Sequence, residues 1–547
     1  MRLINFFLSQ TQTSLRTLGM MAIVAGGSNA ALLSVVNSAA DHIKDGETRI
    51  VSVILFLVLI SAYIYAQRYV LVTTSAEVER LVHSYREKLI TQLKMCELRE
   101  VEHIGRGRIF SAISTDTQVI SQSATGLVYG VQAAVLIVCT AIYLASISMT
   151  SFIISSVFLS ITTRIYIRKM RDVSGLLHEA STEENKLHDL VSGVLDGFKE
   201  VKLSSQRAAV VLADVVSISA RTAVYRTDAQ KSLVINFIFA QAAFMMLLGT
   251  LVFLTPMFGD TYSSTVMGSM TTVMFLIGPI SGIIGSVPLV AVANAAAENL
   301  ESLEKLLNAS TRERNGDALT FARTVASPAL RKIELRRVYF KHDASGGQFS
   351  VGPVDVTIGA GETVFITGGN GSGKSTLIKL ITGLYPPLSG ELLVNDVPVT
   401  TETAQAHRDR FCAVFSDFHL FRKLYGIPLP NAQTAAAWLE EMELSGKTEF
   451  LSDGYSTIDL STGQRKRLAL LNALLEDKPI IVLDEWAADQ DPPFRRKFYD
   501  VLLPRWKAEG KTIIAVTHDD RYFHMADRRF HLEEGQLRDL TEMQTNG

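Results

Sequence analysis

The sequence predicts an α-helical membrane domain with six transmembrane helices and long cytoplasmic extensions, followed by an α/β domain built around a phosphate-binding loop. Two observations carry this prediction. Long stretches without Asp, Glu, Lys or Arg recur up to residue 297, and from Ile333 onward short apolar strands alternate with helices. The composition agrees, because 48% of the residues are apolar, 20% are charged, and the mean hydropathy is +0.21.

Composition also excludes two classes of protein. The 547 residues carry a formal net charge of −2, which argues against a basic nucleic-acid-binding protein. The three cysteines, Cys96, Cys139 and Cys412, lie far apart, so they form neither a disulfide scaffold nor a metal-ligand spacing. We therefore expect no nucleic-acid partner and no cysteine-bound metal.

The charge-free stretches are long enough to cross a membrane, since a helix needs about 20 apolar residues to do so. One of them, 117–163, is too long for one span and fits two, with a turn near residues 146–150. The first has a longer apolar core than the roughly 7–15 residues of a cleaved signal, so we expect it to be retained. The predicted spans are 15–38, 50–72, 124–146, 151–168, 233–255 and 265–293.

The basic residues orient these helices. They concentrate in two long connections, about 73–123 and 169–232, whereas the short connections contain only Lys44 and Arg49. The positive-inside rule then places both termini and both long connections in the cytoplasm. Because the connections favour helix and hold few Gly or Pro, we expect paired helical arms with turns at their tips. The candidate tips are 96–107 and 190–202.

The composition changes after the last span. We expect the membrane domain over residues 1–305, a polar linker over 306–332 and the α/β domain over 333–540. Within the sixth span, the Gly-Pro pair at 278–279 weakens the helix and lets it bend. Met267, Met270 and Met274 share one face of this span, where they either pack against a neighbouring helix or line an adaptable wall.

The strand 363–367 runs into a glycine-rich loop that opens an apolar helix. The glycines let backbone N–H groups surround a phosphate chain, and the helix N-terminus adds a favourable dipole. Lys374 is expected to reach the β- and γ-phosphates, and Ser375 to bind Mg²⁺. The predicted nucleotide-binding residues of this loop are Gly368, Gly369, Asn370, Gly371, Ser372, Gly373, Lys374, Ser375 and Thr376.

A second apolar strand, 479–483, ends in Asp484 and Glu485. A buried parallel strand delivers such residues to the edge of the sheet where ligands bind. Asp484 is expected to help hold Mg²⁺, and Glu485 to polarise the attacking water as a catalytic residue.

Two further elements are ambiguous when taken alone. Ser461, in the string LSTGQ at 460–464, either caps a helix or contacts a ligand. His518 follows an apolar strand, a position at which a lone histidine is usually structural.

The order of these elements resembles the nucleotide-binding domain of ABC transporters: a phosphate loop, LSTGQ, VLDE and a strand-end histidine. The six spans with long arms look like the membrane half of an ABC exporter. The resemblance covers about residues 1–540 and implies an α/β P-loop ABC ATPase domain that binds ATP and Mg²⁺. In this family the phosphate loop and LSTGQ lie on opposite faces, so the resemblance also implies a homodimer.

The resemblance assigns further roles residue by residue. Ser461 and Gly463, followed by Gln464, would meet the γ-phosphate bound on the other subunit. Asp491 fills the loop that links the two ATP sites. His518 would contact the γ-phosphate as a catalytic residue.

Some positions depart from the usual family pattern. His342 occupies the place of the tyrosine that usually stacks on adenine. Ser416 replaces the glutamine that links the nucleotide site to the membrane arms. Together with DEWAADQDP at 484–492 and HDD at 518–520, this serine resembles the cyclic-peptide and siderophore exporter subfamily, similar to exporters of pyoverdine and lasso peptides.

The resemblance therefore implies ATP-driven efflux of a peptide-like cargo, such as a cyclic or lasso peptide or a peptide siderophore. Export would cross the cytoplasmic (inner) membrane of a bacterium by alternating access. The expected partners are a second copy of the chain, the cargo and membrane lipids. Two alternatives stay open: a lipid flippase of the same architecture, and a membrane-tethered ATPase with a sensing or regulatory role.

Overall fold

The structure is a computed structural model that describes residues 15–44, 50–254, 263–312, 329–342 and 349–541. The chain divides into two compact units. The first comprises Met1–Leu89 and Phe110–Leu303, and the second comprises Ile90–Ile109 and Glu304–Gly547. The short segment 90–109 therefore belongs with the C-terminal α/β part, although the chain on either side of it is helical membrane domain.

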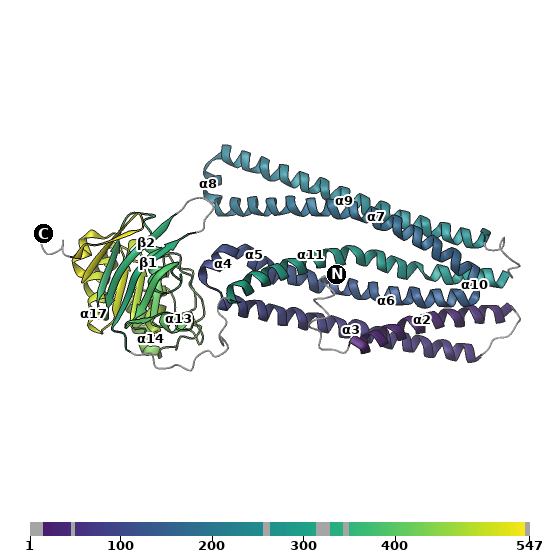
Figure 1. The fold of residues 1–547 in the computed structure, drawn as a ribbon, viewed down its shortest axis with the longest axis horizontal. Coiled ribbons are helices and arrows are strands. Elements are labelled where there is room, and N and C mark those ends of the chain that lie inside the picture. Colours follow the sequence, from purple (N-terminus) through teal and green to yellow (C-terminus); the bar gives the residue numbers. More distant parts are fainter. Residues whose placement is uncertain (1–14, 45–49, 255–262, 313–328, 343–348, 542–547) are drawn as a thin grey trace. The chain divides into compact units, whose positions relative to one another are not determined.

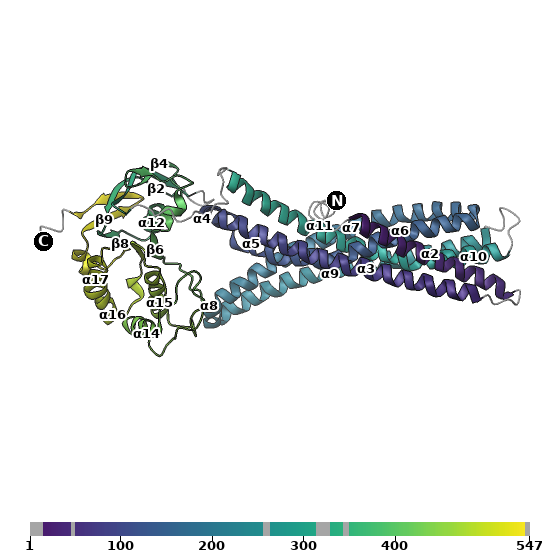
Figure 2. The same ribbon diagram turned by 90° about the horizontal axis from the view of Figure 1, so that it is seen from below.

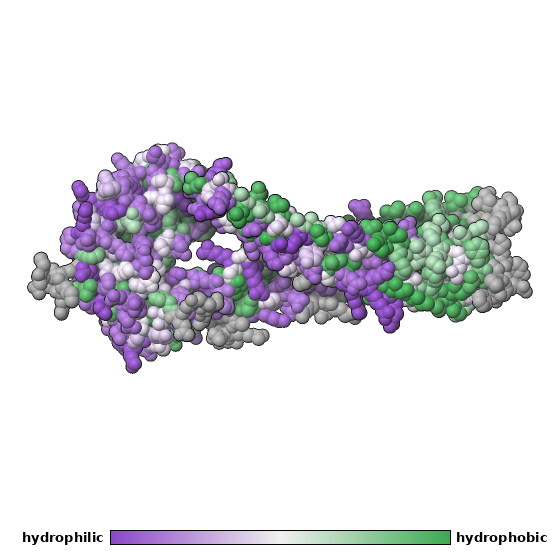
Figure 3. Space-filling view, turned by 90° about the horizontal axis from the view of Figure 1, so that it is seen from above, coloured by the Kyte–Doolittle hydropathy of each residue, from purple (hydrophilic) through white to green (hydrophobic). Residues whose placement is uncertain are grey.

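Within the described residues, six helices are long and apolar enough to cross a membrane, which confirms the predicted number. No more than 28% of any of the six apolar windows is buried inside the structure. Figure 3 shows apolar side chains gathered in a band at one end of the helices, with a more hydrophilic surface along the rest. Such a band is stable against lipid or another subunit rather than against water. The helices that carry the spans are α2 (Leu15–Lys44), α3 (Ile50–Met95), α6 (Thr117–Ile147), α7 (Met149–Asp196), α9 (Ser205–Leu254), α10 (Ser263–Phe275) and α11 (Ile277–Arg312). Helices α10 and α11 together form the sixth span.

The two long connections are helical, as predicted. Helices α3, α7 and α9 extend well beyond a membrane-spanning length, and short helices form the tips. In Figures 1 and 2, α7 and α9 run side by side, and Glu183 of α7 pairs with Arg221 of α9 at 3.1 Å. The tip helices are α4 (Leu98–Ile104), α5 (Arg106–Ser111) and α8 (Phe198–Leu203).

Two local features confirm predictions about the spans. Ser148 ends α6 and caps α7, where its Oγ accepts a hydrogen bond from the Ser151 N–H at 3.2 Å. This turn lies inside the predicted range 146–150. In the sixth span, Leu276 interrupts the helix between α10 and α11. The break follows from Pro279, which lacks an N–H for the Phe275 carbonyl and crowds it with its ring.

The C-terminal unit contains two sheets, seen in Figure 2. The six-stranded sheet has the order β10-β9-β3-β8-β7-β6 and is parallel except for β10, whereas the four-stranded sheet, β2-β1-β4-β5, is antiparallel. The strands are β1 (Lys332–Lys341), β2 (Ser350–Gly359), β3 (Thr363–Thr367), β4 (Ser389–Val394), β5 (Val397–Pro398), β6 (Phe411–Val414), β7 (Ile480–Asp484), β8 (Thr512–Val516), β9 (Arg528–Glu533) and β10 (Gln536–Asp539). This arrangement confirms the predicted α/β domain.

The parallel sheet is covered on both faces. Every residue of β3, β7 and β8 is buried, which is typical of a central parallel strand. One face packs with α12 and the antiparallel sheet, and the other packs with α14, α15 and a cluster that includes Trp486 and Trp506. The helices are α12 (Lys374–Ile381), α13 (Ala404–Arg408), α14 (Ala432–Glu441), α15 (Thr462–Leu475), α16 (Pro492–Lys497) and α17 (Leu503–Ala508).

The arm-tip helix α4 packs on the α/β domain within the second unit. Glu97, which precedes it, pairs with Arg408 of α13 at 2.6 Å. Glu102 pairs with Lys379 of α12 at 3.2 Å and accepts a hydrogen bond from the Tyr385 hydroxyl. Leu98 adds an apolar contact to the core between the two sheets. Charged and apolar contacts together therefore hold this tip on the α/β domain.

Candidate functional site

The glycine-rich loop leaves β3 and enters α12. Gly368, Gly371 and Gly373 have φ angles of 144°, 76° and 104°. A Cβ at Gly368 would lie 2.1 Å from the Leu532 carbonyl oxygen, so only glycine fits there. The loop curls around the Lys374 amine, which donates hydrogen bonds to the carbonyl oxygens of Gly368 at 3.1 Å and Gly369 at 3.0 Å. The N–H groups of the first turn of α12 are thus suited to bind phosphate.

Glu485 and His518 meet Lys374 at the end of the parallel sheet. The Glu485 carboxylate lies 3.6 Å from Lys374 Nζ and 3.3 Å from His518 Nε2, both measured to Oε1. Glu485 has a φ of 51°, a left-handed conformation that costs about 1–2 kcal/mol for a residue with a Cβ. The structure thus brings both predicted catalytic residues to the phosphate loop, where a carboxylate can orient and polarise a water molecule.

Asp484 provides the strongest feature of a metal site. The residue is 1% exposed, and its Oδ2 accepts a hydrogen bond from Ser416 Oγ at 3.1 Å. Its Oδ1 is buried and has no hydrogen-bond partner among the described residues. A buried carboxylate oxygen without a partner is unfavourable unless a ligand satisfies it, and Mg²⁺ prefers oxygen ligands.

The other donors also fit Mg²⁺. Helix α12, which carries Ser375 in its first turn, contacts β7. No cluster of three or more His, Cys, Asp or Glu able to hold a metal occurs in the described part of the chain. The donor set would therefore be one carboxylate, Ser375 and phosphate oxygens, which is the usual way proteins hold Mg²⁺ beside a nucleotide.

His342 follows β1 and lies beside the phosphate loop. Its Nε2 is 3.2 Å from Thr376 Oγ1, the last residue of the predicted loop. Its ring packs edge-on against Phe340 and Tyr385, with centroid distances of 5.0 Å and 5.8 Å. The ring is thus held at the loop by one polar contact and by aromatic contacts with Phe340, Tyr385 and Phe349, the last at 6.4 Å. Adenine stacking by His342 stays a prediction.

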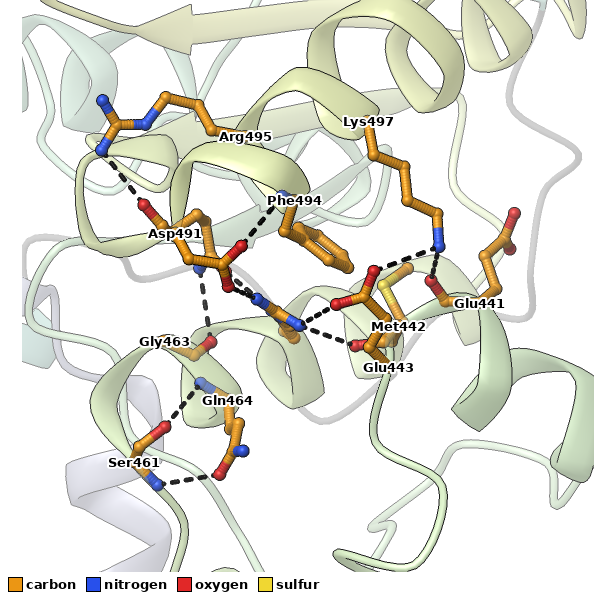
Figure 4. Close-up of polar contacts among 12 residues, drawn as sticks. Glu441, Met442, Glu443, Ser461, Gly463, Gln464, Asp491, Phe494, Arg495 and Lys497 are labelled. Atoms are coloured by element: carbon orange, nitrogen blue, oxygen red, sulfur yellow. Dashed lines mark hydrogen bonds and ion pairs between the residues drawn. The ribbon is translucent and has the colours of Figure 1, made fainter.

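The LSTGQ segment forms the start of α15. Ser461 Oγ accepts from the Gln464 N–H at 3.4 Å, and Gln464 Oε1 accepts from the Ser461 N–H at 3.2 Å, a capping box drawn in Figure 4. A Cβ at Gly463 would lie 2.8 Å from the Asp489 carbonyl oxygen, which explains the glycine. No hydrogen bond or ion pair among the described residues joins this segment to residues 368–376. The predicted site is therefore split within one chain.

Asp491 belongs to the same surface as LSTGQ. It caps α16 by accepting from the Phe494 N–H at 3.0 Å (Figure 4), and it pairs with the buried Arg467 of α15. The Phe494 N–H and the Arg467 guanidinium hold the pKa of Asp491 below its ordinary value. Arg467 also pairs with Glu443 at 2.9 Å and lies 3.7 Å above the Phe494 ring, so it anchors this loop to α15.

Sequence reasoning missed three groups of polar contacts: Ser416 with Asp484, the two buried cations of α15, and the pairs of α4. The sequence does contain a signal for the two buried cations of α15. Lys466 and Arg467 lie on the helix face that also carries Leu470 and Leu471, and a buried cation requires an acidic partner.

Comparison with known proteins identifies the family. A family model described as ABC transporter matches residues 351–488. Over 467 residues the chain is 34% identical to the ATP-binding protein SyrD of Pseudomonas syringae pv. syringae. This match covers 83% of this chain and 82% of SyrD. This chain belongs to the ABC transporter family. It is a half-transporter with a membrane domain and an ATPase domain in one polypeptide, an integral membrane protein that binds ATP and couples its hydrolysis to transport.

Two further similarities refine the family assignment. The fold matches that of a bacterial Atm1-family ABC exporter with ATP bound, with a TM-score of 0.74, coverage of 97% of this chain and 96% of that chain, and 16% identity. This ABC transporter is also 31% identical over 223 residues to the probable syringafactin export ATP-binding/permease protein SyfD of Pseudomonas syringae pv. syringae strain B728a. That match covers 38% of this chain and 33% of SyfD. The predicted ABC exporter fold is thus confirmed.

The contact between Ser416 and Asp484 makes a measurable prediction. Ser416→Ala removes the donor to Oδ2 but leaves Oδ1 unchanged. We expect kcat for ATP hydrolysis to fall by less than about tenfold, because one hydrogen bond contributes roughly 0.5–1.5 kcal/mol. Asp484→Asn should lower kcat by at least about 100-fold, since it removes the carboxylate charge that would hold Mg²⁺ beside the phosphates.

Phosphate release by purified protein, measured across a series of Mg²⁺ concentrations, tests both changes. Ser416→Thr is the matched control, because it keeps the hydroxyl. An equal loss in Ser416→Ala and Asp484→Asn would show that Ser416 is itself a primary metal ligand.

Proposed function

We propose that this protein exports a peptide-like cargo across the cytoplasmic membrane of a bacterium, as a homodimer that works by alternating access driven by ATP. The observation that carries the proposal is that the predicted ATP-binding residues form two separate groups in a chain whose described residues include six apolar helices. Lys374, Glu485 and His518 lie together, whereas no hydrogen bond or ion pair among the described residues joins Ser461 to them. One chain therefore lacks a complete site, and a second chain would supply the missing half.

A two-fold dimer suits this division. Each chain carries both halves, so a self-complementary interface would build two identical sites. Ser461 is exposed at the start of α15, which leaves its hydroxyl accessible to a nucleotide bound by the other chain. Gly463 and Gln464 would approach the same phosphates with their backbone or side-chain amides.

The roles of the residues follow from their positions. The loop 368–376 would bind the phosphates, with Lys374 exchanging its contacts to loop carbonyls for phosphate oxygens. Mg²⁺, held by Ser375 and Asp484, would supply positive charge at the phosphates. Glu485 would polarise the attacking water, and His518 would hold the Glu485 carboxylate and contact the γ-phosphate.

The membrane arms would respond to nucleotide through α4. Glu102 pairs with Lys379 in the last turn of α12, and Lys374 is the first residue of the same helix. Closure of the ATPase domains around ATP would thus move the arm tip with α12 and open the membrane halves outward. Hydrolysis would reset the dimer.

The cargo class rests on two observations. The chain is similar to SyfD, whose name assigns it to syringafactin export. In the sixth span, Met267 and Met274 are exposed in the single chain, whereas Met270 packs against its neighbours. Exposed methionines adapt to surfaces of varied shape, which suits a cargo wall.

Reconstitution tests this function directly. In inside-out proteoliposomes we expect ATP-dependent accumulation of a labelled cyclic peptide and at least about twofold stimulation of ATPase by that peptide. Glu485→Gln is the control: it should bind ATP but lose turnover by about 100-fold or more, as expected for loss of a general base. Stimulation by phospholipid with lipid movement, and none by peptide, would assign a flippase instead. ATPase activity without movement of either would favour a sensing role.

The shared-site arrangement can be tested by mixing two inactive chains. Lys374→Ala removes the lysine of the phosphate loop, and Ser461→Ala removes the serine of the LSTGQ segment. A homodimer of either variant therefore has no intact site. Random pairing should make half of the dimers mixed, each with one intact site, and so restore about one quarter of the wild-type rate. ATPase of co-reconstituted chains is compared with that of each parent. Mixed preparations no more active than the parents would show that the sites are not shared.

The contact between α4 and the ATPase domain can be tested by charge reversal. Glu97→Arg places two cations together at Arg408, so we expect cargo-stimulated ATPase and efflux to fall by about tenfold, with basal hydrolysis changed less than about twofold. The double variant Glu97→Arg with Arg408→Glu should restore both. Lys423→Glu, which disrupts an exposed pair with Asp453, is the matched control. Failure of the double variant to restore stimulation would contradict coupling through this pair.

A further inference from the structure

Lys466 is a buried cation beside the candidate general base. Its side chain is only 6% exposed, although lysine is almost never buried without a partner. The Nζ donates to the Glu485 carbonyl oxygen at 2.9 Å and pairs with the Asp489 carboxylate at 2.7 Å. Both contacts lie on the loop that follows β7, whereas Lys466 itself belongs to α15.

These contacts fix the strained backbone of Glu485. Its φ of 51° is unfavourable for a residue with a Cβ, and such a conformation persists only when its surroundings hold it. Here the Glu485 N–H donates to the Val516 carbonyl oxygen at 3.2 Å, and the Glu485 carbonyl accepts from Lys466. Both backbone groups of Glu485 are therefore held from neighbouring elements, which sets the direction of its side chain.

The connection between α15 and this loop is reciprocal. The Trp486 indole N–H donates to the Lys466 carbonyl oxygen at 2.8 Å, and the Trp486 ring is buried. Further along, the Gln490 side chain donates to the Gly463 carbonyl oxygen at 3.3 Å and accepts from the Arg467 guanidinium at 2.8 Å. The start of α15 and residues 485–491 are thus one hydrogen-bonded body.

We propose that Lys466 is a positioning residue that holds Glu485 in its left-handed conformation and joins it rigidly to the LSTGQ segment. This inference rests on the proposed function, in which Ser461 serves the ATP bound by the other chain while Glu485 serves the ATP bound by its own. Lys466 then makes Glu485 and the LSTGQ segment of one chain move together. Docking of Ser461 on one nucleotide sets the position of Glu485 at the other.

The test is a double-mutant cycle on ATP hydrolysis. We expect Lys466→Met to lower kcat by about tenfold or more while KM for ATP changes less than about threefold, because the phosphate loop is untouched. If Lys466 acts through Glu485, adding Lys466→Met to Glu485→Gln should change the residual single-turnover rate by less than about twofold. A residue with a merely structural role would lower both backgrounds equally. Arg465→Met, an exposed cation on the same helix, is the control with wild-type rates.

Each outcome decides. A wild-type kcat in Lys466→Met, or an equal loss in both backgrounds, overturns the role of Lys466. A wild-type rate in the single variant Glu485→Gln overturns the proposed role of Glu485, and with it the inference built on that role. This outcome is distinguishable from failure of the Lys466 role alone, because it does not involve the Lys466 variants. If Lys466→Met does not fold or bind ATP, Lys466→Gln takes its place, because its amide is one atom shorter and uncharged. That variant should lose about threefold in kcat at unchanged KM, and an unchanged kcat overturns the proposal.

Discussion

The parallel register of β3, β8 and β7 is the constraint on which the ATP site depends. Ile366 of β3 and Asp484 of β7 both pair with Val516 of β8, so the three strands end at one level. The chain then leaves β3 into the phosphate loop, β8 into His518 and β7 into Glu485. A slip of one residue in β7 would turn Asp484 to the opposite face of the sheet and remove it from the site.

Burial on both faces enforces this register. All five residues of each of these strands are buried, so a slip would lose packing on both sides of the sheet. The left-handed turn at Glu485 depends on the same core. The next residue, Trp486, is hydrogen-bonded to α15, and hydrogen bonds with β8 and α15 hold the Glu485 backbone. A well-packed core thus stabilises a locally unfavourable conformation at the point where the chemistry needs it.

The sequence was sufficient for features that depend on local pattern. Five charge-free stretches, one of them long enough for two spans, predicted the six helices. The turn at Ser148 followed from length alone, and the break at Leu276 followed from Pro279. The contacts that decide side-chain positions were not predictable in this way. The bonds of Ser416 and of Lys466 join residues far apart in the chain, and no periodicity encodes such a distance. Likewise, the tip 96–107 was recognisable as a turn, but nothing in it indicated Arg408 or Lys379 as partners.

Ser416 and α4 together bear on how the arms sense nucleotide. The Ser416 hydroxyl donates inward to Asp484, and no hydrogen bond among the described residues joins Ser416 to α4. Helix α12 offers another route. It starts at Lys374 in the phosphate loop, and its last turn carries Lys379, which pairs with Glu102 of α4. Eight residues of helix span only about 12 Å and move as a rigid rod. In the proposed cycle, a shift of the phosphate loop would therefore reach the arm tip through α12 without a glutamine at position 416.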